Sequence, residues 1–395
     1  MKKILMVAAL AAMGAGAAPV VEITSVQQQY PWTNTVDITY TSTGIAEENT
    51  YYVVFKAYDA ASKEIGVITN DLKVSQGSTW VAQWQPPFNV RYENCSMIPY
   101  VYKGGMDDYM VIDLETWQVT YEPMSTQIAS NEKYNTDEYK TKKLVLRKVE
   151  GDKSYQIGYN ETGEITRGNY ANTRHSTFVP ADYYLTIFPV TEGQYRRIMG
   201  DTSYADTNLP VVNLSWNTIR GSAGVMADPT STCVFGKLKA RLEANGFDSG
   251  AGFDLPTESM WEVAARAGVL TRYIWGDTTT GWEAYTTASN NSKASRQVPG
   301  LLRPNAWGFY DMIGNVWDIT RDLGRNTDLA SISEQAQNAF TPFLGGAGQL
   351  IIRLGGGSPL YNAIDTEYYR ISTVYVSDHN NSASVHISFR IAWHK

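Results

Sequence analysis

The stretch GFYDMIGNVWDIT, residues 308–320, most constrains how this chain can fold. It places large apolar and aromatic side chains around two acids, Asp311 and Asp318, with Gly314 between them. Seven residues of helix would separate the acids by about 10.5 Å along the axis. Gly314 gives the backbone the freedom to double back instead. The residues alone leave three interpretations of the stretch: a buried corner of the fold, a metal site or part of an active site.

Composition favours a loop-rich protein packed by aromatic side chains. The 395 residues include 26 Tyr, 11 Trp and 32 Gly, and 43% are hydrophobic against 18% charged. Such a chain can build a large core and is not globally disordered. The formal net charge is −7 and the basic residues form no run, which argues against nucleic acid as a partner.

The first residues read as a signal peptide, residues 1–17. Lys2 and Lys3 precede an apolar run, and Ala15-Gly16-Ala17 forms a small-residue cleavage pattern. The run is too short to span a bilayer, and no later segment reaches about 18 apolar residues, so no transmembrane segment is expected. We therefore expect an exported protein, periplasmic, at the cell surface or extracellular. The alternative is a buried first strand or helix.

The chain contains two cysteines, Cys95 and Cys233. They lie far apart in the sequence and in different expected domains, so we interpret both as free buried thiols rather than as a disulfide.

The fold class expected is α+β, in two domains. Residues 18–122 contain short runs rich in Val, Ile, Thr, Tyr and Trp, separated by turn residues, which predicts an immunoglobulin-like or fibronectin-like β-sandwich. Residues 123–143 are polar and lack periodicity, which indicates a linker. Residues 144–395 form the second domain, with short helices and little other regular structure.

Three helices are expected in the second domain. Thr191 and Gln194 form a capping box that begins the first, which Gly200 ends. The second lies in STCVFGKLKARLEANG and the third in LPTESMWEVAARAG. In the third, Glu262 and Arg266 are spaced for an ion pair. Glu258 and Glu262 could also be an acid/base pair, but we interpret them as surface charges.

The second domain carries a series of landmarks in a familiar order. They are YYLTIFPVTEGQYRRIMG, LPVVNLSWNTIR, FDLPTESMWEVAARAG, YIWGD, RPNAWGFYDMIGNVWDITRD, RLGGGS and SFRIAW. Together they resemble the sulfatase-modifying-factor family, typified by formylglycine-generating enzyme. The resemblance implies a variant of the C-type lectin fold with low regular secondary structure, often stabilised by calcium.

The resemblance implies a structural calcium site in the opening stretch. Side chains would come from Asp311 and Asp318, and carbonyls from Gly314 and Val316. Oxygens that share one Ca²⁺ lie within about 4.8 Å of each other, which again requires a loop that doubles back. The family commonly has Glu where this chain has Asp318. The alternative is that both acids cap local backbone N–H groups without metal.

The family's oxidase activity uses two cysteines after a Gly-Gly-Ser motif, which bind copper(I). After Gly356-Gly357-Ser358, the matching positions hold Tyr361 and Thr366, and neither can bind copper(I). A second branch of the family holds iron with three histidines from an added helical domain, which this chain lacks. We therefore expect neither copper nor iron, and no catalytic residue of the family.

The segment after the Gly-Gly-Ser motif is dense in side chains that suit adaptable recognition surfaces. It predicts a non-catalytic module that binds a glycan or a cell-surface protein, although about half of its tyrosines could instead fill the core. The alternatives are an enzyme of the same family with unrecognised chemistry and a purely structural component. The candidate ligand-binding residues are Tyr361, Asp365, Tyr368, Tyr369, Tyr375, Asp378 and Asn380.

Overall fold

The computed structural model divides the chain into two compact units. Unit 1 comprises residues 1–108 and 123–133, and unit 2 comprises residues 109–122 and 134–395. The structure describes residues 20–29, 35–44, 50–58, 64–68, 73–74, 79–84, 95–104, 108–123, 133–159, 170–171, 174–222, 224, 226–250, 252–278, 280–287, 295–323, 338–342, 352–357, 369–377 and 384–394. The predicted signal peptide lies outside these residues.

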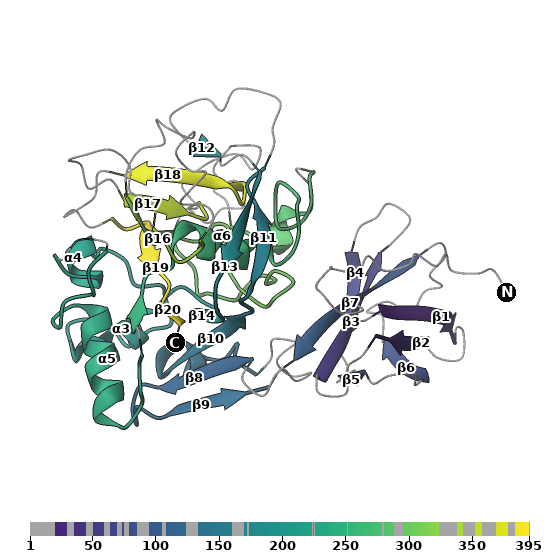
Figure 1. Cartoon of the computed structure of the whole chain (residues 1–395), viewed down its shortest axis with the longest axis horizontal. Helices are drawn as coiled ribbons and strands as arrows, with labels where there is room; N and C mark the ends of the chain where they lie inside the picture. Colours follow the sequence, from purple (N-terminus) through teal and green to yellow (C-terminus); the bar gives the residue numbers. More distant parts are fainter. Residues whose placement is uncertain are drawn as a thin grey trace. The chain divides into compact units, whose positions relative to one another are not determined.

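Unit 1 contains two antiparallel sheets (Figure 1). The first has the order β1-β2-β6, with bounds Val20–Gln28, Val36–Thr43 and Thr79–Trp84. The second has the order β4-β3-β5, with β7 also paired to β3, and bounds Glu64–Ile68, Thr50–Tyr58, Lys73–Val74 and Ser96–Gly104.

Alternation of side chains explains why these two sheets pack together. In β2, burial alternates along the strand, and Ile38 and Tyr40 are fully buried. They belong to one core with Val53 and Phe55 of β3. Two sheets that share a core in this way form the predicted sandwich.

The main sheet of unit 2 is antiparallel and six-stranded, in the order β15-β20-β14-β10-β8-β9. The bounds are Phe253–Asp254, Ala392–His394, Tyr183–Thr186, Lys143–Val149, Tyr109–Asp113 and Val119–Glu122. A two-stranded sheet pairs β11, Lys153–Ile157, with β13, His175–Val179.

The third sheet of unit 2 has the order β12-β18-β17-β16-β19. Strands β16 and β19 are parallel, and the other pairs are antiparallel. This sheet carries the corner described below and part of the predicted ligand segment. The bounds are Tyr170–Ala171, Thr373–Ser377, Ile352–Gly355, Trp317–Leu323 and Ile387–Phe389.

The domain boundaries differ from those predicted. Strands β8 and β9 pair with each other, and β8 pairs with β10, so residues 109–122 belong to unit 2 and not to the sandwich. The predicted linker is wrong from residue 134 onward, where unit 2 resumes. Tyr134 and Lys140 are buried, and α2, Asp137–Thr141, leads directly into β10. The polar composition of residues 134–143 gave no sign that they contain a helix and buried side chains.

The helices of unit 2 follow their sequence signals closely. Helix α3, Glu192–Met199, has the predicted capping box of Thr191 and Gln194 and ends at Gly200 with φ 67°. The other helices are α4, Trp216–Ile219, α5, Val234–Ala244, α6, Glu258–Arg266, and the short 3₁₀ helix η1, Trp282–Ala284. The three predicted helices, α3, α5 and α6, are confirmed.

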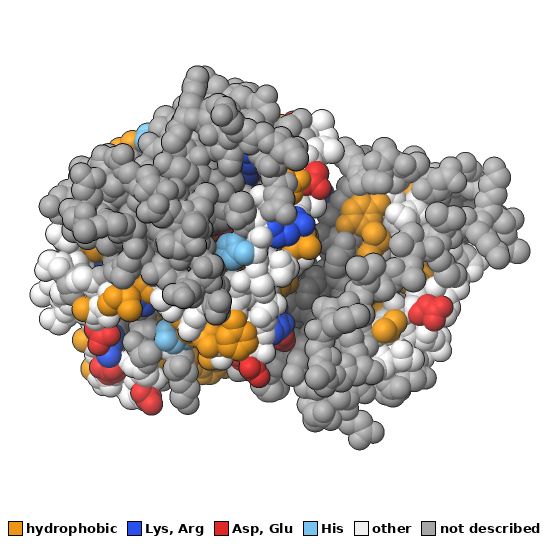
Figure 2. Space-filling model, turned by 45° about the horizontal axis from the view of Figure 1, so that its top comes forward, with side chains coloured by type: hydrophobic (Ala, Val, Ile, Leu, Met, Phe, Trp, Pro, Cys, Tyr) orange, Lys and Arg blue, Asp and Glu red, His pale blue; other side chains and the backbone are white. Residues whose placement is uncertain are grey.

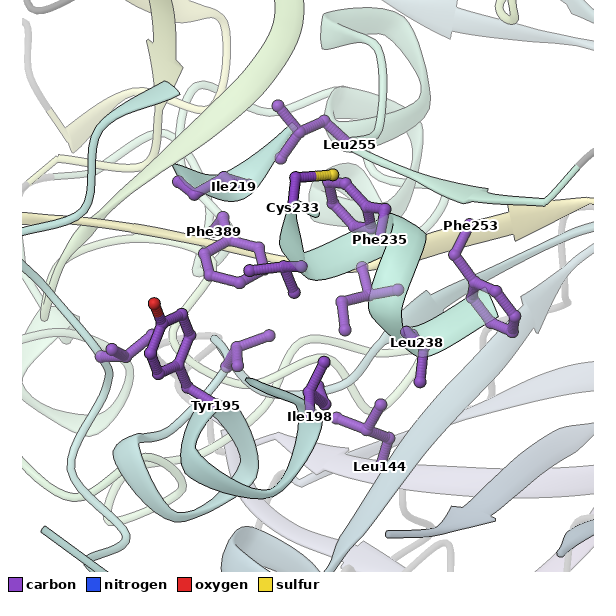
Figure 3. Close-up of a cluster of buried hydrophobic side chains, with 14 of the residues drawn as sticks. Leu144, Tyr195, Ile198, Ile219, Cys233, Phe235, Leu238, Phe253, Leu255 and Phe389 are labelled. Atoms are coloured by element: carbon purple, nitrogen blue, oxygen red, sulfur yellow. The ribbon is translucent and has the colours of Figure 1, made fainter. Parts of the chain in front are cut away.

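The core of unit 2 lies between the six-stranded sheet and helices α3 and α5 (Figure 3). Phe235 and Leu238 of α5 are buried there, as the helical spacing predicts. Cys233 begins α5 and lies among Ile219, Phe235 and Leu255. Both cysteines are free and buried, which confirms that prediction. Among the described residues, no helix is long and apolar enough to cross a membrane.

Candidate functional site

The stretch 308–318, which we call the motif corner, packs against the end of α6. Asn305 begins this arrangement, because its side-chain amide donates to the carbonyls of Ala264 and Ala265 at 2.7 and 3.0 Å. Its side-chain oxygen accepts from the backbone N–H groups of Trp307 and Phe309. One buried side chain thus satisfies carbonyls at the helix end and fixes the turn that follows.

The corner doubles back at Gly314 and Asn315, whose φ angles are 83° and 61°. A Cβ on Gly314 would lie 2.0 Å from the hydroxyl of Thr286, so only glycine fits. The Gly314 N–H donates to the carbonyl of Gly356 at 2.6 Å. The Asn315 side chain bonds both the N–H and the carbonyl of Gln297. The predicted reversal is confirmed, and it brings the corner against Gly356, which follows strand β17.

Asp311 is bonded to its own loop. Its carboxylate accepts from the Gly300 N–H at 2.7 Å and from the Asn315 side-chain amide at 3.3 Å. Burial raises the pKa of the Asp311 carboxyl, and the Gly300 hydrogen bond and the charge of Arg390 oppose that rise.

Asp318 lies in β16 and is fully buried. One carboxylate oxygen accepts from Arg390 Nε at 2.7 Å and from the Trp261 indole N–H at 3.0 Å. Arg390 is also fully buried and donates to the carbonyls of Thr186 and Tyr310 at 3.1 and 2.6 Å. The ion pair therefore joins the corner, helix α6 and strand β14.

The other oxygen of Asp318 is buried and has no hydrogen-bond partner among the described residues. Ser388 pairs with Asp318 in the neighbouring strand β19. Its hydroxyl is also buried and has no hydrogen-bond partner among the described residues. Unpartnered buried oxygens are the kind of donor that Ca²⁺ accepts. Against this, Arg390 already balances the charge of Asp318, and the Gly314 carbonyl accepts from the Val316 N–H at 2.7 Å. The donor types fit calcium, and the calcium site stays a prediction.

Of the predicted ligand-binding residues, the structure describes Tyr369 and the backbone of Tyr375. Tyr369 is fully buried, so it anchors its segment and is not a surface contact. Tyr375 lies in β18, which pairs with β17. The other predicted positions lie outside the described residues, as does Thr366. They are Tyr361, Asp365, Tyr368, Asp378 and Asn380.

The interpretation of Glu258 and Glu262 as surface charges is wrong. Their exposed fractions are 8% and 1%. Glu262 pairs with Arg266 at 2.8 Å as predicted, but both are buried, and together they bond the N–H and the carbonyl of Gly158. Helix α6 is buried on all sides, so its charges serve the packing of β11 rather than solubility.

Sequence reasoning also missed Arg390 and Trp261 as partners of Asp318. A signal for Arg390 was present, because it stands alone in the apolar run ISFRIAW, where an unpaired charge would be costly. Its partner lies 72 residues away, which no local pattern reveals.

The sulfatase-modifying factor enzyme 1-like domain family matches residues 149–395. A formylglycine-generating enzyme of Streptomyces coelicolor is 29% identical over 197 residues, which cover 47% of this chain and 52% of that protein. An inactive C-alpha-formylglycine-generating enzyme 2 of Mus musculus is 30% identical over 146 residues, which cover 33% of this chain and 39% of that protein. The chain thus spans about half or less of these relatives' length.

The structure of PvdO from Pseudomonas aeruginosa is 13% identical, with a TM-score of 0.49, covering 64% of this chain and 95% of that one. The family match covers more than half of the chain and includes the motif corner and the Gly-Gly-Ser motif. The protein therefore belongs to the sulfatase-modifying factor enzyme 1-like family.

Proposed function

We propose that this protein is an exported, non-catalytic binding module on a formylglycine-generating-enzyme-like scaffold, and that it recognises a glycan or a cell-surface protein. The observation that carries the proposal is the position of the two thiols. Cys95 lies in unit 1, and Cys233 lies in the core of unit 2 at the start of α5. Two thiolates are needed to hold copper(I) in the family's oxidase, and these two belong to separate compact units.

The chemistry of Cys233 supports the same proposal. Its sulfur accepts from the Gly236 N–H at 3.5 Å and is packed in the core, where it caps the helix. A buried thiol with a structural contact is inert compared with an exposed thiolate. A relative whose name states that it is inactive is consistent with this scaffold persisting without the oxidase.

The binding face of the proposal is the segment from Tyr361 to Asn380. Its described part is firmly anchored, because Tyr369 and Ile371 are buried and β18 pairs with both β12 and β17. Anchoring of the described part reduces the entropic cost of recognition by the segment that contains it. In Figure 2, the hydrophobic side chains of the described residues appear as separate patches.

The test is a capture experiment with the chain from Ala18 onward, immobilised and exposed to glycan panels and to cell-surface extracts. A variant with Tyr361, Asp365 and Tyr368 changed to Ala should lose capture, and Tyr121→Ala, at a residue 43% exposed elsewhere on unit 2, should keep it. Full capture by the triple variant would refute the proposed face. An oxygen-dependent mass change on a cysteine-containing peptide would refute the absence of catalysis.

A further inference from the structure

Residues 270–278 and 280–285, which we call the aromatic turn, form a compact surface structure beside the motif corner. Tyr273 and Gly276 exchange backbone hydrogen bonds of 3.0 and 3.2 Å. The carboxylate of Asp277 accepts from the Arg272 N–H at 2.8 Å. The turn leads into Thr286 and Thr287, which contact the corner at Gly314 and Asn315. Its backbone is therefore held at both ends.

Three aromatic rings of this turn are stacked in a row. Tyr273 is buried, with 1% exposed, and Trp275 stacks on it at 4.7 Å with an interplanar angle of 4°. Tyr285 follows at 6.4 Å from Trp275 with an angle of 27°. The Trp275 indole N–H donates to the Thr278 carbonyl at 2.9 Å. Trp275 and Tyr285 are partly exposed, so the turn presents rigid ring surface to solvent.

The side chains around the stacked rings are polar. Asp277, Thr278, Thr280 and Glu283 are exposed. Among the described residues of the turn, Leu270, 44% exposed, is the one exposed large aliphatic residue. A stable protein–protein interface buries about 800 Å² of surface on each partner, around a core that is more apolar than its rim. Ring surface bordered by hydroxyls and carboxylates suits a small amphipathic ligand instead.

The charges near the turn have both signs. Tyr159 donates its hydroxyl to Asp277 at 3.2 Å, and the guanidinium groups of Arg174 and Arg272 lie 5.7 and 5.5 Å from its ring. Mixed charges create no single-sign field that would select a polyanion. The chemistry therefore favours an uncharged ligand with an apolar face and a hydroxylated edge, which describes a pyranose sugar.

The turn is also continuous with the segment of the proposed binding face. The Ile371 N–H donates to the Arg272 carbonyl at 3.1 Å, so the anchored base of that segment lies against the start of the turn.

We infer that the aromatic turn is a subsite for a neutral pyranose saccharide. The outer face of the Tyr285 ring, supported from behind by Trp275, packs on the C–H face of the sugar, and the carboxylates of Asp277 and Glu283 accept hydrogen bonds from its hydroxyls. This inference rests on the proposed function and narrows its ligand from a glycan or protein to a glycan.

The experiment is affinity electrophoresis of the chain from Ala18 onward in gels that contain dextran, mannan or galactan. We expect at least one polysaccharide to retard the protein, and Trp275→Ala to weaken that binding about tenfold or more, as loss of an aromatic anchor does. Trp275→Tyr keeps a ring and should restore most of the binding, which separates loss of contact from loss of fold. Trp80→Ala changes a Trp that is 37% exposed in unit 1 and should bind like the parent chain.

No retardation by any of the three polysaccharides would overturn the inference, as would equal retardation of the parent chain and Trp275→Ala. Loss of binding in Trp275→Ala that Trp275→Tyr does not restore would also overturn it. Capture of cell-surface proteins that is unaffected by Trp275→Ala would overturn the inference and leave the proposed function standing. Capture of nothing from glycan panels or extracts would overturn both.

Discussion

The motif corner and the aromatic turn lie side by side but differ in how they use polar residues and glycine. In the corner, Asp318 and Arg390 are fully buried and bonded to each other, and Gly314 has no room for a Cβ. In the turn, Asp277 and Glu283 are exposed, and Gly281 has open space where a Cβ would be. The same residue types therefore serve different purposes in the two regions.

This difference separates the residues that identify the family from the surface that is available to a ligand. The corner carries one of the motifs by which the family is recognised, yet its two acids and Asn315 are bonded within the fold. The turn contains another of the family landmarks, YIWGD, but keeps ring surface and carboxylates exposed. A motif that identifies a family can report how the chain folds, while surface available for a ligand lies in the neighbouring loop.

The largest effect is expected for Arg390→Met. It leaves the carboxylate of Asp318 buried without its charge partner, which costs about 3–5 kcal/mol in the free energy of unfolding. Urea denaturation of the chain from Ala18 onward measures the loss. Arg174→Met, at an exposed arginine beside the aromatic turn, is the matched control and should cost well under 1 kcal/mol, as exposed charges do. A loss below about 1 kcal/mol in Arg390→Met would contradict the structural role of the pair.

A smaller change in the free energy of unfolding distinguishes the cost of a left-handed backbone from the cost of close packing. Gly314 and Gly281 have φ angles of 83° and 89°. Ala at either position must adopt a left-handed backbone conformation, which costs about 1–2 kcal/mol. At Gly314 the new Cβ also meets the Thr286 hydroxyl, so Gly314→Ala should cost about 2 kcal/mol more than Gly281→Ala. Equal unfolding free energies for the two variants would show that the corner is not closely packed.

Calcium provides the next test of the corner. If Asp311, Gly314, Val316 and Asp318 hold calcium as predicted, calcium at about 100 times its dissociation constant adds about 2.7 kcal/mol to the stability. Thermal unfolding in calcium and in chelator measures the difference, and Asp318→Asn should reduce it. The same midpoint in both solutions would mean that Arg390 alone balances Asp318.

The smallest effect concerns His386, whose carbonyl accepts from the Trp317 N–H beside the corner. Burial lowers the pKa of its imidazole below the ordinary 6.5. The unfolded chain therefore binds the proton more tightly, and the contribution of His386 to stability is present above pH 6.5 and lost as the pH falls through the lower pKa of the folded state. His386→Gln should remove this part of the pH dependence. An unchanged difference in unfolding free energy between variant and parent from pH 8 to pH 5 would contradict it.

Much of unit 2 was predictable because its signals are local. The capping box at Thr191, the buried positions of α5 and the reversal at Gly314 each depend on residues a few positions apart. The domain boundary was not predictable in this way. Strands β8 and β9 are rich in Val, Ile, Thr and Tyr like those of the sandwich, and only the pairing of β9 with β8 and of β8 with β10 assigns them to unit 2.

By itself, the sequence determined the family, the confirmed helices, the burial of both thiols and the turn at Gly314. Tertiary structure alone decided that Glu262 is buried, that Asp318 pairs with Arg390, and that the aromatic turn lies against the corner and Ile371. The physical reason is the range of the interactions. Caps, turns and helical faces arise from neighbours within one or two turns of chain, whereas buried ion pairs and shared surfaces require segments that only the folded chain brings together.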